Sequence, residues 1–183
     1  MVVAVAGSGA EPAVVLRRRV ELSRRTPRQP FHAAEGRPFA AAEALIRRST
    51  DEAAALAERA LRELLAELRA AGCEPVTSGI LLAAGRPLPD LREILGSHAL
   101  IHSAEGELFR DVVRQASARA GLQVVSVRER ELEAGAARAL NRSAAELTRV
   151  VAGWGKELGP PWTQDEKRAA LVAWLALAHR TSS

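Results

Sequence analysis

Cysteine, aromatic residues and long apolar runs are all scarce in this chain of 183 residues. Its single cysteine, Cys73, excludes an internal disulfide, which fits a reducing compartment, and we expect a cytoplasmic protein. Aromatic residues make up 3% of the chain and tyrosine is absent, so the core must consist mostly of Leu, Val, Ile and Ala. No apolar run approaches the roughly 20 residues that a membrane-spanning helix needs. The N-terminus also lacks the basic-then-apolar pattern of a signal peptide.

Lysine is scarce as well, and the net charge of +4 rests on arginine. Residues 1–50 carry nine arginines and four acidic residues, whereas the rest of the chain is close to neutral. A basic surface attracts polyanions through their phosphates. The candidate nucleic-acid-binding residues are Arg17, Arg19, Arg24, Arg25, Arg28 and Arg110. The alternative is a solvated arginine-rich face in a chain that uses arginine almost everywhere, since its only lysines are Lys156 and Lys167.

The pattern of apolar residues predicts one α/β domain over residues 1–183, with a mixed central sheet of about five strands flanked by helices. The strands are expected at Val2–Ala6, Ala13–Leu22, Phe31–Ala34, Pro75–Leu82 and Leu122–Val127. The first two should form a hairpin around Gly7-Ser8-Gly9, which is a turn rather than a phosphate-binding loop because no Gly-Lys-Ser/Thr follows it.

A long helix is expected from Phe39 to Ala71, with a candidate restart at the capping-box pattern Ser49-x-x-Glu52. Further helices are expected at 90–95, 130–140, 143–158 and 163–179, besides one that runs through the central stretch to Gly121. The last two begin at capping-box patterns, Ser143-x-x-Glu146 and Thr163-x-x-Glu166.

The central stretch, Ser97–Arg110, holds two of the four histidines together with two glutamates, two serines and an arginine. On a helix, His98 and His102 lie one turn apart on one face, and Glu105 follows on that face. Two imidazoles and a carboxylate in this arrangement can hold a divalent metal with open coordination positions, or act as an acid–base pair. This stretch is the main candidate for a functional site.

A structural role for the same residues remains open. Ser97 or Ser103 can cap a helix, and Glu105 and Glu107 are favoured near its positive N-terminal end. The two histidines would then be packing residues at the start of the helix. His32 lies alone in the sequence and is interpreted as a surface or edge histidine rather than a ligand.

The candidate site also includes charged residues of the last helix. Asp165 and Lys167 would approach the central stretch if the two helices pack over one edge of the sheet. The candidate catalytic residues are Ser97, His98, His102, Glu105, Glu107, Asp165 and Lys167. The candidate metal ligands are His98, His102 and Glu105, and a divalent metal is the only cofactor that the pattern indicates.

The order of the expected elements resembles the ribonuclease H-like fold, and within it the RuvC-type Holliday junction resolvases. The resemblance is carried by Val2-Val3-Ala4-Val5-Ala6-Gly7-Ser8-Gly9, which is similar to that family's first strand and turn, and by the last helix, Glu166–His179. It implies a nuclease that uses carboxylates to hold two metal ions. Those carboxylates are missing here, because Ala6 stands near the expected aspartate and no acid lies in 81–84.

Three functions are therefore compatible with the sequence. The first is a catalytically degenerate or non-standard ribonuclease H-like domain that acts by binding, with nucleic acid as its partner. The second is a metal-dependent hydrolase that uses His98, His102 and Glu105. The third is a dimerising scaffold protein, with a second copy of the chain as partner. None of the three assigns the protein to a membrane.

Overall fold

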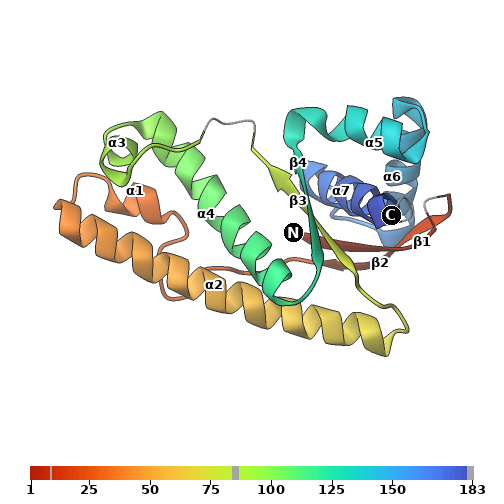
Figure 1. Cartoon of the computed structure of the whole chain (residues 1–183), viewed down its shortest axis with the longest axis horizontal. Coiled ribbons are helices and arrows are strands. Elements are labelled where there is room, and N and C mark those ends of the chain that lie inside the picture. The colour runs from red at the N-terminus through yellow and green to blue at the C-terminus, as the bar shows by residue number, and fades with distance from the viewer. Residues whose placement is uncertain (9, 84–86, 181–183) are drawn as a thin grey trace.

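The computed structural model describes residues 1–8, 10–83 and 87–180, and most of them are helical (Figure 1). The helices are α1 (Pro30–Ala34), α2 (Phe39–Ala70), α3 (Leu91–Leu95), α4 (His98–Arg119), α5 (Leu132–Leu140), α6 (Ala144–Leu158) and α7 (Gln164–Arg180). The strands are β1 (Val2–Gly7), β2 (Pro12–Arg18), β3 (Thr77–Leu82) and β4 (Gln123–Arg128). A turn of 3₁₀ helix, Glu129–Glu131, joins β4 to α5.

The predicted five-stranded mixed sheet is wrong. The described strands form two separate sheets of two strands each: β1 pairs with β2 in an antiparallel hairpin, and β3 pairs with β4 in parallel. Ala6 therefore lies on β1 opposite Ala13 in a two-stranded sheet, not on the central strand that a ribonuclease H-like layout requires. Gly9, within the predicted hairpin turn, and residue 84, within the segment searched for an acid, lie outside the described residues.

The strand predicted at Phe31–Ala34 is instead helix α1. Pro30 occupies the first turn, where its fixed φ suits a helix and its missing N–H costs no hydrogen bond. The side chains of Pro30, Phe31 and Ala34 are buried, so the short helix is held by packing rather than by its length. His32 therefore lies on the surface of a helix rather than at the edge of a sheet.

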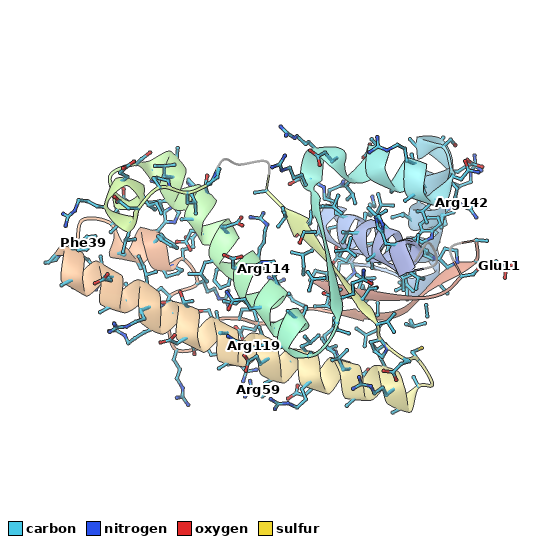
Figure 2. All side chains as sticks on the ribbon, in the orientation of Figure 1. Glu11, Phe39, Arg59, Arg114, Arg119 and Arg142 are labelled. Atoms are coloured by element: carbon cyan, nitrogen blue, oxygen red, sulfur yellow. The ribbon has the colours of Figure 1, made fainter. Side chains whose placement is uncertain are left out.

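The long helix is confirmed, because α2 runs without a break from Phe39 to Ala70. Figure 2 labels Phe39 at its first turn, at one end of the molecule. Ser49 does not restart it: the Ser49 hydroxyl donates to the carbonyl of Leu45, one turn earlier (3.0 Å). Glu52 turns away from the helix and accepts hydrogen bonds from the backbone N–H groups of Arg25 and Thr26. The apparent capping box at residues 49–52 therefore ties a neighbouring loop to the helix.

Of three hydrophobic clusters among the described residues, the two larger hold most of the elements together. One packs α1, α2, α3 and α4 around Ile101, Ala53 and Val112. The other surrounds α7, with Trp174, Trp154 and neighbours from α5, α6 and β1. In Figure 1 the beginning of α4 lies beside α1 and α3 at one end of the molecule, whereas α5, α6 and α7 lie at the other. Within the described residues, no helix is long and apolar enough to cross a membrane.

Helix α7 begins at a cap that makes its stability depend on pH. The carboxylate of Glu166 is buried and accepts hydrogen bonds from the backbone N–H (2.8 Å) and the hydroxyl of Thr163. The Thr163 hydroxyl bond lowers the pKa of Glu166 below the ordinary value of 4.5. A lowered pKa in the folded state means that the cap stabilises the fold above the ordinary pKa, and that this contribution is lost as the pH falls through the folded-state pKa.

We therefore expect Glu166→Gln to lower the free energy of unfolding by about 1 kcal/mol at pH 7. The difference from the wild type should shrink as the pH is lowered below 4.5, because the wild-type carboxylate then becomes neutral as well. Urea unfolding at pH 7, 5 and 4 measures both effects. Glu157→Gln, which changes an exposed residue of α6, is the control. A difference that stays constant with pH would contradict this assignment.

Candidate metal centre

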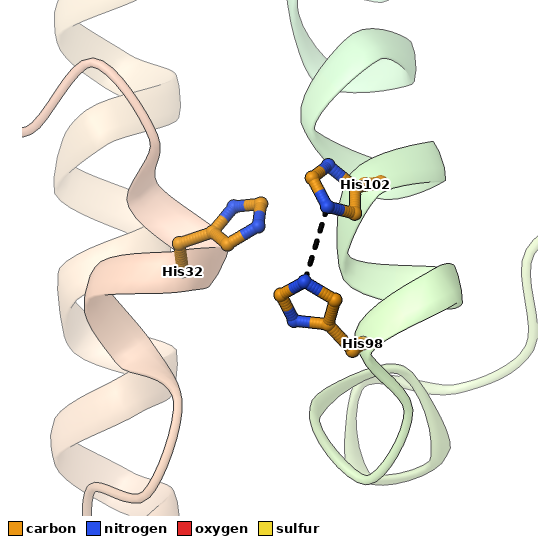
Figure 3. A group of neighbouring side chains, drawn as sticks. All are labelled: His32, His98 and His102. Atoms are coloured by element: carbon orange, nitrogen blue, oxygen red, sulfur yellow. Dashed lines mark hydrogen bonds between the residues drawn. The ribbon is translucent and has the colours of Figure 1, made fainter.

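Three of the four histidines lie together at one end of the molecule (Figure 3). His98 is the first residue of α4 and His102 lies one turn later, as the spacing in the sequence predicts. His32 lies in the middle of α1, and its ring points toward the other two. One potential ligand atom from each ring lies within 4.8 Å of the other two, and no other group of three or more His, Cys, Asp or Glu side chains is this close within the described residues.

The two histidines of α4 are already spaced as metal ligands. Their Nε2 atoms are 3.2 Å apart. Two nitrogen ligands at about 2.0–2.1 Å from a tetrahedral zinc ion are separated by about 3.3 Å, so this pair needs almost no rearrangement. The same distance suits an N–H···N hydrogen bond, in which one Nε2 carries a proton and the other accepts it. A metal ion between the two nitrogens would replace that proton.

Glu105 is the partner of His32, not a third member of the ligand set predicted from the sequence. Its Oε1 lies 3.1 Å from Nδ1 of His32 and also accepts the backbone N–H groups of Phe31 (2.8 Å) and His32 (3.0 Å). A carboxylate at Nδ1 fixes the tautomer that places the proton there and leaves the Nε2 lone pair free for a metal. Figure 3 shows Nε2 as the edge of His32 that faces the other rings.

The environment of Glu105 is unusual for a carboxylate. The residue is only 8% exposed, and its Oε2 is buried without a hydrogen-bond partner among the described residues. An unpaired buried oxygen on an ionised group is unfavourable unless positive charge is nearby. The N-terminal end of α1 supplies part of that charge through its backbone N–H groups. A metal bound to His32 would supply the rest.

His98 has a carboxylate behind it as well. Oε1 of Glu35, the residue that follows α1, lies 3.9 Å from Nδ1 of His98. Both side chains are exposed, His98 to 65% and Glu35 to 47%. Since Nε2 of His98 faces His102, Glu35 lies on the far side of the ring from the proposed metal position. Only His32 therefore has a carboxylate within hydrogen-bond distance of its Nδ1, the arrangement that orients metal-binding histidines. Glu35 is too far from His98 for a hydrogen bond and adds only a nearby negative charge.

The other candidate catalytic residues do not join this cluster. Ser97 is the N-cap of α4 but makes no side-chain capping bond. Glu107 faces Arg110 on the same helix, with the nearest atoms 3.8 Å apart. Asp165 and Lys167 lie in the first turn of α7, a helix that lies apart from the start of α4 (Figure 1). Helix α7 packs mainly on β1, β3 and α5, whereas α4 packs mainly on α2 and α3, so the two helices share β3 but are not packed on one another as expected.

Some of the arginines proposed to bind nucleic acid pair with groups of the protein itself. Arg17 donates to the carbonyls of Gly159 (2.8 Å) and Pro161 (2.6 Å), just beyond the end of α6. Arg24 and Arg28 share Glu21, and Arg110 faces Glu107. The backbone N–H of Arg25 is bonded to Glu52, and Arg19 is exposed next to the end of β2. The structure therefore assigns several of these residues structural contacts and leaves phosphate binding by them a prediction.

His32 is the ligand candidate that the sequence did not reveal. Pro30 and the alanines after His32 are a weak signal of a short helix, which would have corrected the strand. Nothing local to residue 32 indicates that it meets residues 98 and 102, because that contact depends on how α1 packs between α2 and α4. A lone histidine can complete a site whose other members are distant in the sequence.

The chain matches no protein-family model, no curated protein and no solved structure. The resemblance to RuvC-type resolvases therefore has no support beyond the sequence pattern, and the geometry of the histidines is the best guide to function.

Proposed function

We propose that this protein binds one divalent transition-metal ion, with zinc as the best fit, through His32, His98 and His102. The single observation that carries the proposal is the convergence of three imidazoles from two elements, two of them 3.2 Å apart. Imidazole nitrogens suit zinc, copper and nickel, whereas calcium and magnesium prefer oxygen. Three nitrogen ligands in a tetrahedral arrangement favour zinc.

The surroundings of the ligands support this choice. Glu105 lies at Nδ1 of His32 and orients that ring, and Glu35, 3.9 Å from Nδ1 of His98, adds a second negative charge near a doubly charged ion. The histidines lie on α1 and on the start of α4. These two helices are anchored in the same hydrophobic cluster by the buried side chains of Phe31 and Ile101. The ligands therefore stand on a packed surface, and the ion would have to draw His32 closer by at most about 1.5 Å.

The proposal is tested by titrating the purified protein with zinc after removal of metal by a chelator. We expect one equivalent to bind the wild type, and His102→Ala to weaken binding at least 100-fold. The matched control is His179→Ala, which removes the fourth histidine, an exposed residue of α7, and should bind like the wild type. Cobalt(II) gives a second readout, because a tetrahedral site produces strong visible absorption bands. Equal uptake by wild type and His102→Ala would rule the centre out.

Binding should also weaken on acidification, because imidazole ligates a metal only when it is neutral. We expect zinc affinity to fall as the pH is lowered from about 7.5 to about 5.5, with protons released on binding at the higher pH. Isothermal calorimetry in two buffers of different ionisation enthalpy counts those protons. Binding that releases none over this range would contradict ligation by histidine.

A further inference from the structure

The coordination of the proposed centre is incomplete. Structural zinc sites are closed by four protein ligands, whereas catalytic sites have three and keep one position for water or substrate. Here the described residues contribute three histidines and no fourth His, Cys, Asp or Glu to the group. Of two nearby carboxylates, Glu105 is buried at Nδ1 of His32, and the exposed Glu35 lies 3.9 Å from Nδ1 of His98, on the side of that ring away from His102.

The open position faces solvent. His98 and His102 are exposed, and only His32 is half-buried. Two cavities, of about 790 Å³ and 260 Å³, lie elsewhere: the first lies between the strands and α2, α4 and α7, and the second lies between α5, α6 and α7. None of the three histidines lines either cavity. A reactant at this centre therefore has free access but few side chains to hold it, so the metal ion itself must activate it.

We propose, resting on the zinc centre above, that the bound metal carries a water molecule at this position and hydrolyses small neutral esters. A zinc ion with three imidazole ligands lowers the pKa of its water to about 7, so that hydroxide is available near neutral pH. The water gives its proton to solvent, and the hydroxide oxygen forms a bond to the ester carbonyl carbon. The carbon–oxygen bond to the alcohol then breaks, and the proton of the attacking hydroxide passes to the leaving oxygen. A carboxylate and an alcohol are released, and a new water binds.

The charges around the centre set the substrate class. The two positive charges of the ion are partly offset by the buried carboxylate of Glu105, at Nδ1 of His32, and by the exposed carboxylate of Glu35, 3.9 Å from Nδ1 of His98. A centre whose positive charge is reduced in this way gains less from an anionic substrate, so phosphate diesters should react poorly. A neutral carboxylic ester requires no such attraction, since the metal and its hydroxide act on the carbonyl group directly.

The experiment compares two probes, p-nitrophenyl acetate and the anionic bis(p-nitrophenyl) phosphate, with one equivalent of zinc on the wild type, His102→Ala and His179→Ala. We expect ester hydrolysis at least tenfold faster with the wild type and His179→Ala than with His102→Ala. The rate should rise between about pH 6.5 and 8.5 as the bound water ionises. The diester should show less than a tenth of that enhancement. Glu35→Gln should raise the diester rate relative to the ester rate, because it removes one negative charge.

Zinc uptake is measured on the same samples, so the possible failures are distinguishable. A wild type that binds one zinc ion but hydrolyses the ester no faster than His102→Ala overturns the hydrolytic inference and leaves the metal-binding function standing. A wild type that binds no zinc would overturn both the hydrolytic inference and the proposed metal-binding function. A larger enhancement for the diester than for the ester overturns the assignment of neutral substrates.

Discussion

Replacing Trp174 with alanine is expected to lower the free energy of unfolding by about 3–5 kcal/mol, the range for deleting a buried aromatic side chain. Trp174 lies on α7, is fully buried, and meets Trp154 of α6 edge to face with ring centroids 5.5 Å apart. The guanidinium of Arg142 lies 5.5 Å from the centre of its ring. Alanine would leave a large cavity at the point where α5, α6 and β1 meet α7.

Urea unfolding followed by far-ultraviolet circular dichroism measures this loss without relying on tryptophan fluorescence. Val15→Ala is the control, because Val15 is 45% exposed on β2 and its truncation should change stability by less than about 0.5 kcal/mol. Trp174→Phe should fall between the two, since it keeps part of the ring contact with Trp154. Unfolding curves for Trp174→Ala that overlay those of the wild type would show that this cluster does not hold α7 in place.

Helices that carry strong local signals could be predicted from the sequence. Helix α2 was expected from Phe39 to Ala71 and ends one residue earlier. It could be predicted because its apolar stripe and the glycine at 72 are local features of the sequence. The capping box at Ser143 is present with both of its hydrogen bonds. The paired strands β1 and β2 were also expected as a hairpin, although β2 ends at Arg18 rather than at Leu22.

The sheet was wrong because strand pairing is a long-range property. β3 and β4 lie close to the predicted positions and pair with each other. The positions of these strands in the sequence do not say whether a further strand pairs beside them. Whether β1 joins their sheet depends on the side chains that pack between the two sheets. Gly79 illustrates the point, since a Cβ at that position would lie 2.7 Å from the carbonyl oxygen of Val172. β3 is therefore in close contact with helix α7 through a glycine, a contact that no periodicity predicts.

The candidate site was predictable only in part, for the same reason. The spacing of His98 and His102 places them on one helical face whatever the rest of the chain does. The role of Glu105 depends on a partner 73 residues away, and its burial turns a presumed ligand into a residue that orients His32. The sequence pattern therefore indicated helix α4 correctly, but it did not indicate that α1, which carries His32, packs against it.

Replacing Glu105 with glutamine is expected to weaken zinc binding about 10–100-fold, the usual effect of removing a carboxylate behind a metal-binding histidine. Glutamine keeps the length of the side chain and can still accept the backbone N–H groups of Phe31 and His32 through its amide oxygen. It removes the negative charge that polarises His32. The loss should therefore appear in metal affinity more than in the fold.

Two variants separate the charge of Glu105 from its structural role. Glu105→Ala should weaken zinc binding and also destabilise the metal-free protein by about 1–3 kcal/mol, because the buried N–H of Phe31 loses its acceptor. Glu107→Gln, a half-buried glutamate on the same helix, should leave zinc affinity unchanged. The measurements are zinc titration and urea unfolding of the metal-free protein. If Glu105→Gln bound zinc as tightly as the wild type, the buried carboxylate would belong to the packing of α1 alone and would have no part in the metal centre.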